Sequence, residues 1–137
     1  MTITTNLHIL IAEDDSDDCE IILNCFTQHP TFSKITIVRN GKELLDFLKK
    51  ENEKPDVILT DINMPIVNGL EALFEIYSNA ELKKIPAFAY STSINPLYKK
   101  KCLQYGVKEF IIKPFIIEEF DKIPKIIHHH IHQMLSV

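Results

Sequence analysis

Short apolar runs alternate with amphipathic segments along nearly the whole chain, and this alternation limits the possible folds more than any other feature. The apolar runs are Leu7–Ala12, Ile35–Val38, Val57–Thr60, Ala87–Tyr90 and Phe110–Ile112. Most of them are continuously apolar rather than alternating in polarity, which is typical of strands buried on both faces. The sequence therefore predicts a parallel sheet of five strands.

Between these runs, apolar residues recur at helical spacing. The stripes comprise Cys19, Ile22, Leu23 and Phe26; Leu44, Leu45 and Leu48; Leu70, Leu73 and Tyr77; Tyr98, Cys102 and Tyr105; and Ile116, Phe120, Ile123, Ile127 and Ile131. Pro124 interrupts the last stripe, so we expect a kink or a break there. Strands and helices in strict alternation predict an α/β fold: a doubly wound (βα)5 sandwich with right-handed crossovers and helices on both faces.

The length and the net charge of the chain limit the number of domains and the classes of partner that we expect. A chain of 137 residues is enough for one domain with a real core and too short for two, so we expect a single domain over 1–137 with its core over about 7–132. The net charge of −4 argues against nucleic-acid binding, and no apolar stretch is long enough to cross a membrane. The three cysteines form no CxxC pair, which favours reduced thiols and a cytoplasmic location.

The residues that follow the predicted strands carry the chemistry, because ligands of open α/β sheets bind outside the carboxyl ends of the strands. The strand-end residues are Glu13-Asp14-Asp15, Asp61, Ser91-Thr92-Ser93 and Lys113-Pro114. Only the second strand differs, since Arg39-Asn40-Gly41 is typical of a turn into a helix. Four strands thus bring carboxylates, a hydroxyl and a lysine to one edge.

This combination of side chains suits phosphoryl transfer onto a carboxylate. Crowded carboxylates repel one another unless a cation balances them, and Mg²⁺ prefers oxygen ligands. A lysine supplies a compact positive charge for a phosphate, and a hydroxyl can donate to a phosphoryl oxygen. An aspartate can itself be the nucleophile and form an acyl phosphate.

In their order along the chain, these residues resemble the receiver domains of two-component response regulators, including the stand-alone chemotaxis type. The resemblance runs from about Leu7 to His132. The segment DINMPIVNG, which begins at Asp61, is similar to the phosphoacceptor segment of the family, and Lys113-Pro114-Phe115 is similar to its Lys-Pro step, whose peptide bond is usually cis. The resemblance implies a flavodoxin-like sheet with the strand order 2-1-3-4-5.

The resemblance also implies a role for each residue of the site. The implied residues are the phosphoacceptor Asp61; the Mg²⁺ ligands Asp14, Asp15, Asp61 and the backbone carbonyl of Asn63; the phosphate contacts Lys113 and Ser91; the switch residues Ser91 and Phe110; and Thr92, which governs access. Thr92 stands where many receivers have alanine or glycine, and Phe110 lacks the hydroxyl that a tyrosine would offer.

The family further implies partners. The phosphoryl donor would be a sensor histidine kinase or a phosphotransfer protein, and the output would pass through the face of the fourth helix, fifth strand and fifth helix to a protein target, with a homodimer as one arrangement. We expect no output domain, no nucleic-acid or membrane partner, and no catalysis beyond the protein's own phosphorylation and dephosphorylation.

Simpler interpretations apply to several of these features. Acids before a helix can act as caps or as favourable charges, and we favour the helix-dipole interpretation for Asp17, Asp18 and Glu20. The run His128–His132 invites a metal interpretation, but an exposed helix end explains it better. The Lys99–Lys101 run is typical of a solvated helix face, with a partner surface as the alternative.

Rival classes of function remain at this stage. A haloacid-dehalogenase-like phosphatase needs a second acid two residues after its nucleophile, where this chain has Asn63. A flavodoxin-like flavin carrier needs a phosphate loop after the first strand, where the acids of EDDSDD would repel phosphate. A degenerate receiver that is never phosphorylated is the third alternative.

Overall fold

A computed structural model describes residues 6–50, 52, 54–93 and 95–135. Five strands form one parallel sheet in the order β2-β1-β3-β4-β5. The strands are β1 Leu7–Ala12, β2 Phe32–Val38, β3 Val57–Asp61, β4 Ala87–Ser91 and β5 Phe110–Ile112. The helices are α1 Ser16–Thr27, α2 Gly41–Lys49, α3 Gly69–Tyr77, α4 Pro96–Tyr105 and α5 Lys122–Leu135, with short 3-10 turns η1 Leu82–Lys84 and η2 Ile117–Asp121. The predicted doubly wound fold and strand order are confirmed.

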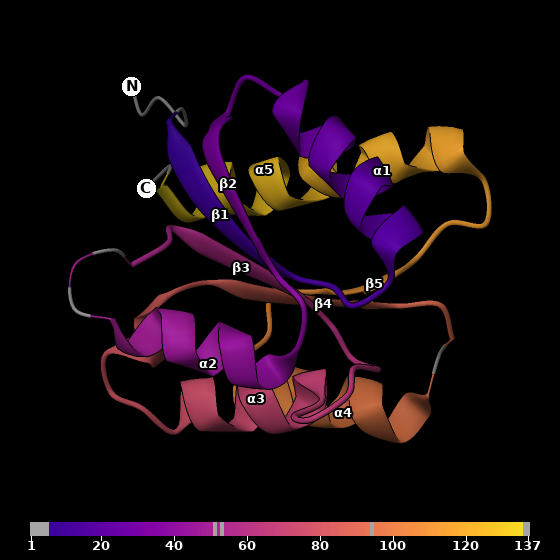
Figure 1. Ribbon diagram of the computed structural model, residues 1–137. Coiled ribbons are helices and arrows are strands. Elements are labelled where there is room, and N and C mark those ends of the chain that lie inside the picture. Colours follow the sequence, from indigo (N-terminus) through magenta and orange to yellow (C-terminus); the bar gives the residue numbers. More distant parts are fainter. Residues whose placement is uncertain (1–5, 51, 53, 94, 136–137) are drawn as a thin grey trace.

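Helices cover both faces of the sheet (Figure 1). Helices α1 and α5 lie on one face, and α2, α3 and α4 lie on the other. Each face has its own buried apolar cluster, and successive residues of a strand belong to opposite clusters. On β1, for example, Ile9 and Ile11 pack toward α1 and α5, whereas Leu10 and Ala12 pack toward the other layer.

The same alternation sorts the residues at the strand ends. Tyr90 belongs to the cluster under α1 and α5, together with Ile11, Leu59 and Ile111. Residues two positions beyond Ile11, Leu59 and Ile111 share that face. By strand parity, the α1–α5 face therefore receives Glu13, Asp61 and Lys113 beside Tyr90. Phe110 belongs to the opposite cluster.

The apolar stripe from Ile116 to Ile131 shows a break rather than a kink, two residues before Pro124. The 3-10 turn η2 covers Ile117–Asp121, and α5 begins at Lys122. Pro124 is thus in the first turn of α5, where its missing N–H has no intrahelical partner to lose. The proline helps to start the helix rather than to bend it.

Two further expectations concern membrane-spanning segments and the state of the cysteines. None of the helices in the described ranges is both long and apolar enough to span a membrane. Cys19, Cys25 and Cys102 are all free thiols, and Cys25 and Cys102 are buried. Burial raises the pKa of the Cys25 thiol to about 12 and that of Cys102 to about 11, so both stay protonated and behave as small apolar side chains.

Candidate functional site

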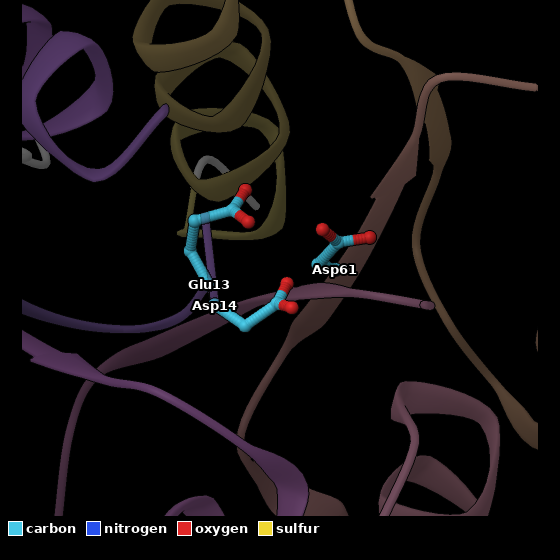
Figure 2. A group of neighbouring side chains, drawn as sticks. All are labelled: Glu13, Asp14 and Asp61. Atoms are coloured by element: carbon cyan, nitrogen blue, oxygen red, sulfur yellow. The ribbon is translucent and has the colours of Figure 1, made fainter. Parts of the chain in front are cut away.

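Three carboxylates meet at the carboxyl ends of β1 and β3 (Figure 2). Glu13, Asp14 and Asp61 each offer one oxygen, and these oxygens all lie within 4.8 Å of one another. Within the part of the chain that the structure describes, this is the one such group of three or more metal-ligating side chains. An all-oxygen, anionic set at this spacing fits a hard divalent cation such as Mg²⁺, because the ion would remove the repulsion between the carboxylates.

Asp15, which the sequence predicted as a metal ligand, has another role. Its carboxylate caps α1 by accepting the N–H of Asp18 at 3.0 Å, and it does not join the carboxylate group. The cap satisfies a backbone donor that the first turn of the helix leaves free. The structure therefore brings Glu13 and Asp14, rather than the predicted pair Asp14 and Asp15, close to Asp61 in the acidic corner.

Asp61 ends β3 and is almost completely buried, with 5% of its surface exposed. Its Oδ2 accepts from Nζ of Lys113 at 2.9 Å, and its Oδ1 accepts the N–H of Asn63 at 3.1 Å. Burial raises the pKa of Asp61 from its ordinary value of 3.8 to about 6, although the hydrogen bond from Lys113 lowers it. The nearby Glu13 carboxylate adds to the rise. A cation at this corner would favour the ionised form.

The turn that follows Asp61 depends on Gly69. The N–H of Gly69 donates to the carbonyl of Ile62 at 2.9 Å, and a β-carbon at Gly69 would overlap the carbonyl oxygen of Asp61. Asn68 and Glu71 form a capping box that begins α3 immediately beside this contact. The start of α3 is thus packed directly against the backbone of the candidate nucleophile.

Lys113 reaches the same corner from the end of β5. Its ammonium nitrogen lies 2.7 Å from Glu13, 2.9 Å from Asp61 and 3.0 Å from Asp18. Burial of the lysine would lower its pKa, but the hydrogen bonds to Glu13 and Asp61 outweigh burial and raise the pKa above its ordinary value. Lys113 is therefore a permanently charged group at the site.

The family-based expectation of a cis bond before Pro114 is wrong for this structure, in which no described peptide bond is cis. A trans bond nonetheless brings the ammonium group to Asp61. The backbone N–H of Lys113 donates to the carbonyl of Ser91 at 2.8 Å and so continues the pairing of β5 with β4. This pairing holds the residue in register without a special peptide geometry.

Glu13 was missed as a site residue by the sequence analysis. Its side chain is fully buried and receives hydrogen bonds from the Tyr90 hydroxyl at 2.5 Å and from Lys113. Burial alone would raise the pKa of Glu13, but these two donors outweigh it and lower the pKa. Strand parity was the available signal, because Glu13 continues the series of Ile9 and Ile11.

Asp18 was also interpreted too simply. The sequence favoured a helix-dipole role for this acid, whereas the structure gives its carboxylate an ion pair with Lys113. Asp18 is three residues beyond the cap of α1, so the first turn of that helix turns it toward the strand ends.

The predicted switch residues lie on the other side of the sheet edge. Ser91 is 2% exposed, and Thr92 beside it is exposed. Phe110 is already buried, at 7% exposure, within the cluster beneath α2, α3 and α4. Phe110, which the resemblance implied as a switch residue, thus has no outward position in this structure from which it could turn inward on phosphorylation.

The histidines of α5 are used in ordinary contacts. The Nδ1 of His128 lies 2.6 Å from the Thr31 hydroxyl, and the His128 and His132 rings stack with their centroids 6.0 Å apart. Nε2 of His130 lies 2.7 Å from Glu109. These contacts favour the structural interpretation over a metal site.

Beyond β1, β3 and β5, the open parallel sheet thus brings together a group of acids and a buried lysine. The family model described as the response regulator receiver domain matches residues 9–125, and the chain belongs to this family. It is therefore a receiver domain of two-component signalling.

Individual relatives agree with this assignment. The chain is 32% identical over 107 residues to the two-component response regulator ORR11 of Oryza sativa, covering 78% of this chain and 71% of the relative. A crystal structure of the phosphorylated cyanobacterial phytochrome response regulator RcpA matches with a TM-score of 0.84 and 30% identity, covering 91% of this chain and 93% of the other. The Mn²⁺-bound form of the response regulator Rcp1 matches with a TM-score of 0.83 and 25% identity, covering 96% of each chain.

Proposed function

We propose that this receiver accepts a phosphoryl group on Asp61 from a histidine kinase or a phosphotransfer protein. The observation that carries the proposal is that one buried carboxylate lies beside both the candidate metal site and the buried lysine. Asp61 belongs to the group of acids that fits a divalent cation, and it also receives a hydrogen bond from the buried ammonium of Lys113. Phosphoryl transfer depends mainly on such positioning and neutralisation of charge.

In the proposed reaction a carboxylate oxygen of Asp61 attacks the phosphorus of the donor. A new P–O bond forms as the bond to the donor nitrogen or oxygen breaks, and the leaving group keeps that electron pair. Lys113, 2.9 Å from Asp61 before the reaction, would hold an oxygen of the transferred group. Bound Mg²⁺ would neutralise the charge of the acids and of the phosphoryl oxygens.

We choose the proposed Mg²⁺ ligands from the carboxylates that lie together in the structure, and not from the pair Asp14 and Asp15 that the sequence suggested. Glu13, Asp14 and Asp61 would hold Mg²⁺ directly or through water, and Asp15 would serve as the helix cap. We retain the backbone carbonyl of Asn63 as a further ligand, because the N–H of Asn63 is hydrogen-bonded to Asp61 and places that peptide beside the site.

The proposed output is a change in protein contacts. Ser91 ends the strand next to Asp61, so its hydroxyl can move toward a phosphoryl oxygen, with exposed Thr92 governing access and buried Phe110 packing behind it. The change would be recognised on the face of α4, β5 and α5 by a target protein or a second copy of the chain. The Lys99–Lys101 run lies on α4 and would belong to this face.

The test is mass spectrometry of the intact protein after incubation with Mg²⁺ and acetyl phosphate. The parent protein should gain one phosphoryl group, and chelation of the metal should prevent the gain. Asp61→Asn should gain none, whereas Asp46→Asn, changed in the same way on an exposed surface of α2, should gain as much as the parent. Equal modification of Asp61→Asn would refute Asp61 as the acceptor, and an unmodified parent would indicate a degenerate receiver.

A further inference from the structure

Tyr90 occupies an unusual position for a large polar side chain. It is the last residue before Ser91 in β4, its backbone lies in register with Asp61 of β3, and its side chain is completely buried. If the side chain served only to fill the core under α1 and α5, phenylalanine would fill the same space without the cost of burying a hydroxyl. The hydroxyl therefore needs a separate explanation.

The contacts of the Tyr90 side chain lead to the acidic corner. Its hydroxyl donates to Oε1 of Glu13 at 2.5 Å, and Nζ of Lys113 lies 4.6 Å from the centre of its ring. One side chain thus binds a carboxylate of the candidate metal site through its hydroxyl and contacts the neighbouring cation through its ring. Glu13 and Lys113 are themselves 2.7 Å apart.

Glu13 requires this support because its carboxylate has no access to water. Oε1 accepts from Tyr90 and is contacted by Lys113, and Oε2 accepts the N–H of Asp15 at 3.1 Å. The three donors compensate the burial of the charge and prevent the carboxylate from rotating. The ammonium of Lys113 is shared with Asp18 and Asp61, so among these three donors Tyr90 supplies the side-chain hydrogen bond that Glu13 does not share with those acids.

We propose that Tyr90 is a positioning residue of the metal site, which holds the Glu13 carboxylate in the orientation that Mg²⁺ requires. The inference rests on the metal site of the proposed function and adds a residue that would not touch the ion. Groups that hydrogen-bond to metal-binding carboxylates typically change metal affinity by about 10- to 100-fold when they are removed.

The experiment compares two changes that each remove one hydrogen-bonded tyrosine hydroxyl. Mg²⁺ binding to the unphosphorylated full chain is measured by titration calorimetry for the parent, Tyr90→Phe and Tyr77→Phe. Tyr77 is the matched control because its hydroxyl donates to the carbonyl of Gly106 at 3.0 Å, in the layer of α3 and α4. Tyr90→Phe should bind Mg²⁺ about tenfold more weakly, and Tyr77→Phe should bind like the parent.

A purely structural role for Tyr90 makes a different prediction. In that case both variants would melt at lower temperature without metal, but neither would change its affinity for Mg²⁺. Binding to Tyr90→Phe that equals binding to the parent would overturn the proposal. If the parent itself binds no Mg²⁺, the metal site of the proposed function fails instead, so the two failures are distinguishable.

The route through Glu13 is tested with a double-mutant cycle. If Tyr90 acts by orienting Glu13, Tyr90→Phe should cause no further loss of Mg²⁺ affinity once Glu13→Ala has removed the carboxylate. A full tenfold further loss in that background would refute this route.

If a variant does not fold, a measurement on the parent protein still tests the proposal. Mg²⁺ titration followed by near-ultraviolet circular dichroism should change the tyrosine signal with the midpoint found by calorimetry, because the phenol is bonded to a carboxylate that binds the ion. A tyrosine signal that stays constant through saturation would count against the proposal.

Discussion

At the scale of single residues, Asp61 is placed where its ionised form is unfavourable before a cation binds. Burial raises its pKa to about 6 in the folded protein, against an ordinary value of 3.8 that applies to the unfolded chain. The folded protein therefore holds this proton more tightly, and the stabilisation that the proton gives is complete below pH 3.8 and is lost as the pH rises through 6. Above pH 6 the metal-free protein carries an unfavourable buried charge.

Asp61→Asn should therefore stabilise the metal-free protein in neutral and alkaline solution. We expect the free energy of unfolding at pH 8 to rise by about 1 to 3 kcal/mol, with the gain shrinking below pH 6 and disappearing near pH 4. Urea unfolding in the presence of a chelator measures this. Asp46→Asn should show no such gain, because the hydrogen bond from Lys42 lowers the pKa of that exposed acid. An Asp61→Asn protein less stable than the parent at pH 8 would contradict the prediction.

The residues of the site were predictable to different degrees. Asp61 and Lys113 could be identified because each directly follows an apolar strand. Among three consecutive acids, however, the sequence does not reveal where the strand ends and the helix cap begins. The sequence pointed to Asp14 and Asp15, whereas the structure groups Glu13 and Asp14 with Asp61. Tyr90 was hidden for another reason, since a tyrosine inside an apolar run is usually a core residue.

At the scale of elements, the turn between β3 and α3 is held by a close backbone contact. Replacing glycine by alanine in a helix normally stabilises a protein by about 0.5 to 1 kcal/mol. At Gly69, the first residue of α3, the new methyl group would overlap the Asp61 carbonyl, so the sign should reverse. We expect Gly69→Ala to lose about 1 to 3 kcal/mol of stability and to accept phosphate more slowly.

Thermal unfolding and the acetyl phosphate assay together measure this change. Glu75→Ala, on the exposed side of the same helix, is the control and should behave like the parent in both. A stabilised Gly69→Ala protein with the parent rate would show that the start of α3 can move away from Asp61 without consequence.

The elements themselves were predictable, and their ends and connections less so. Continuous apolar runs located all of the strands, although β2 begins at Phe32, before the predicted Ile35. The role of Pro124 depends on where α5 begins. The sequence did not reveal that boundary, because the apolar stripe runs through η2 and on into α5. The peptide bond before Pro114 depends on packing around the turn, which the residue types alone do not determine.

At the scale of the whole molecule, Ser91 should couple phosphorylation to the face of α4, β5 and α5. A hydrogen bond from its hydroxyl to a charged phosphoryl oxygen is worth about 1.5 to 3 kcal/mol, which biases two states about ten- to a hundred-fold. Ser91→Ala should take up phosphate almost normally but show a weaker change in amide hydrogen exchange over these elements. Since Phe110 is already buried, the response should not require it to turn inward.

Hydrogen exchange with beryllofluoride and Mg²⁺ measures the response. Ser93→Ala removes an exposed hydroxyl from the same turn and should respond like the parent. A full response of Ser91→Ala would exclude this residue as the link between the site and the surface.

The alternation of side chains across the sheet divides the core into two layers that can change independently of each other. Tyr90, Ile11 and Ile111 face α1 and α5, whereas Phe110 faces the other layer. Changes in the first layer should alter how tightly the ion is held and how long the phosphoryl group persists. Changes around Phe110 in the second should alter how the switch residues act on the output face of α4, β5 and α5. Over evolution, a receiver of this kind can therefore change its protein partner while keeping the same ion affinity and the same phosphoryl lifetime.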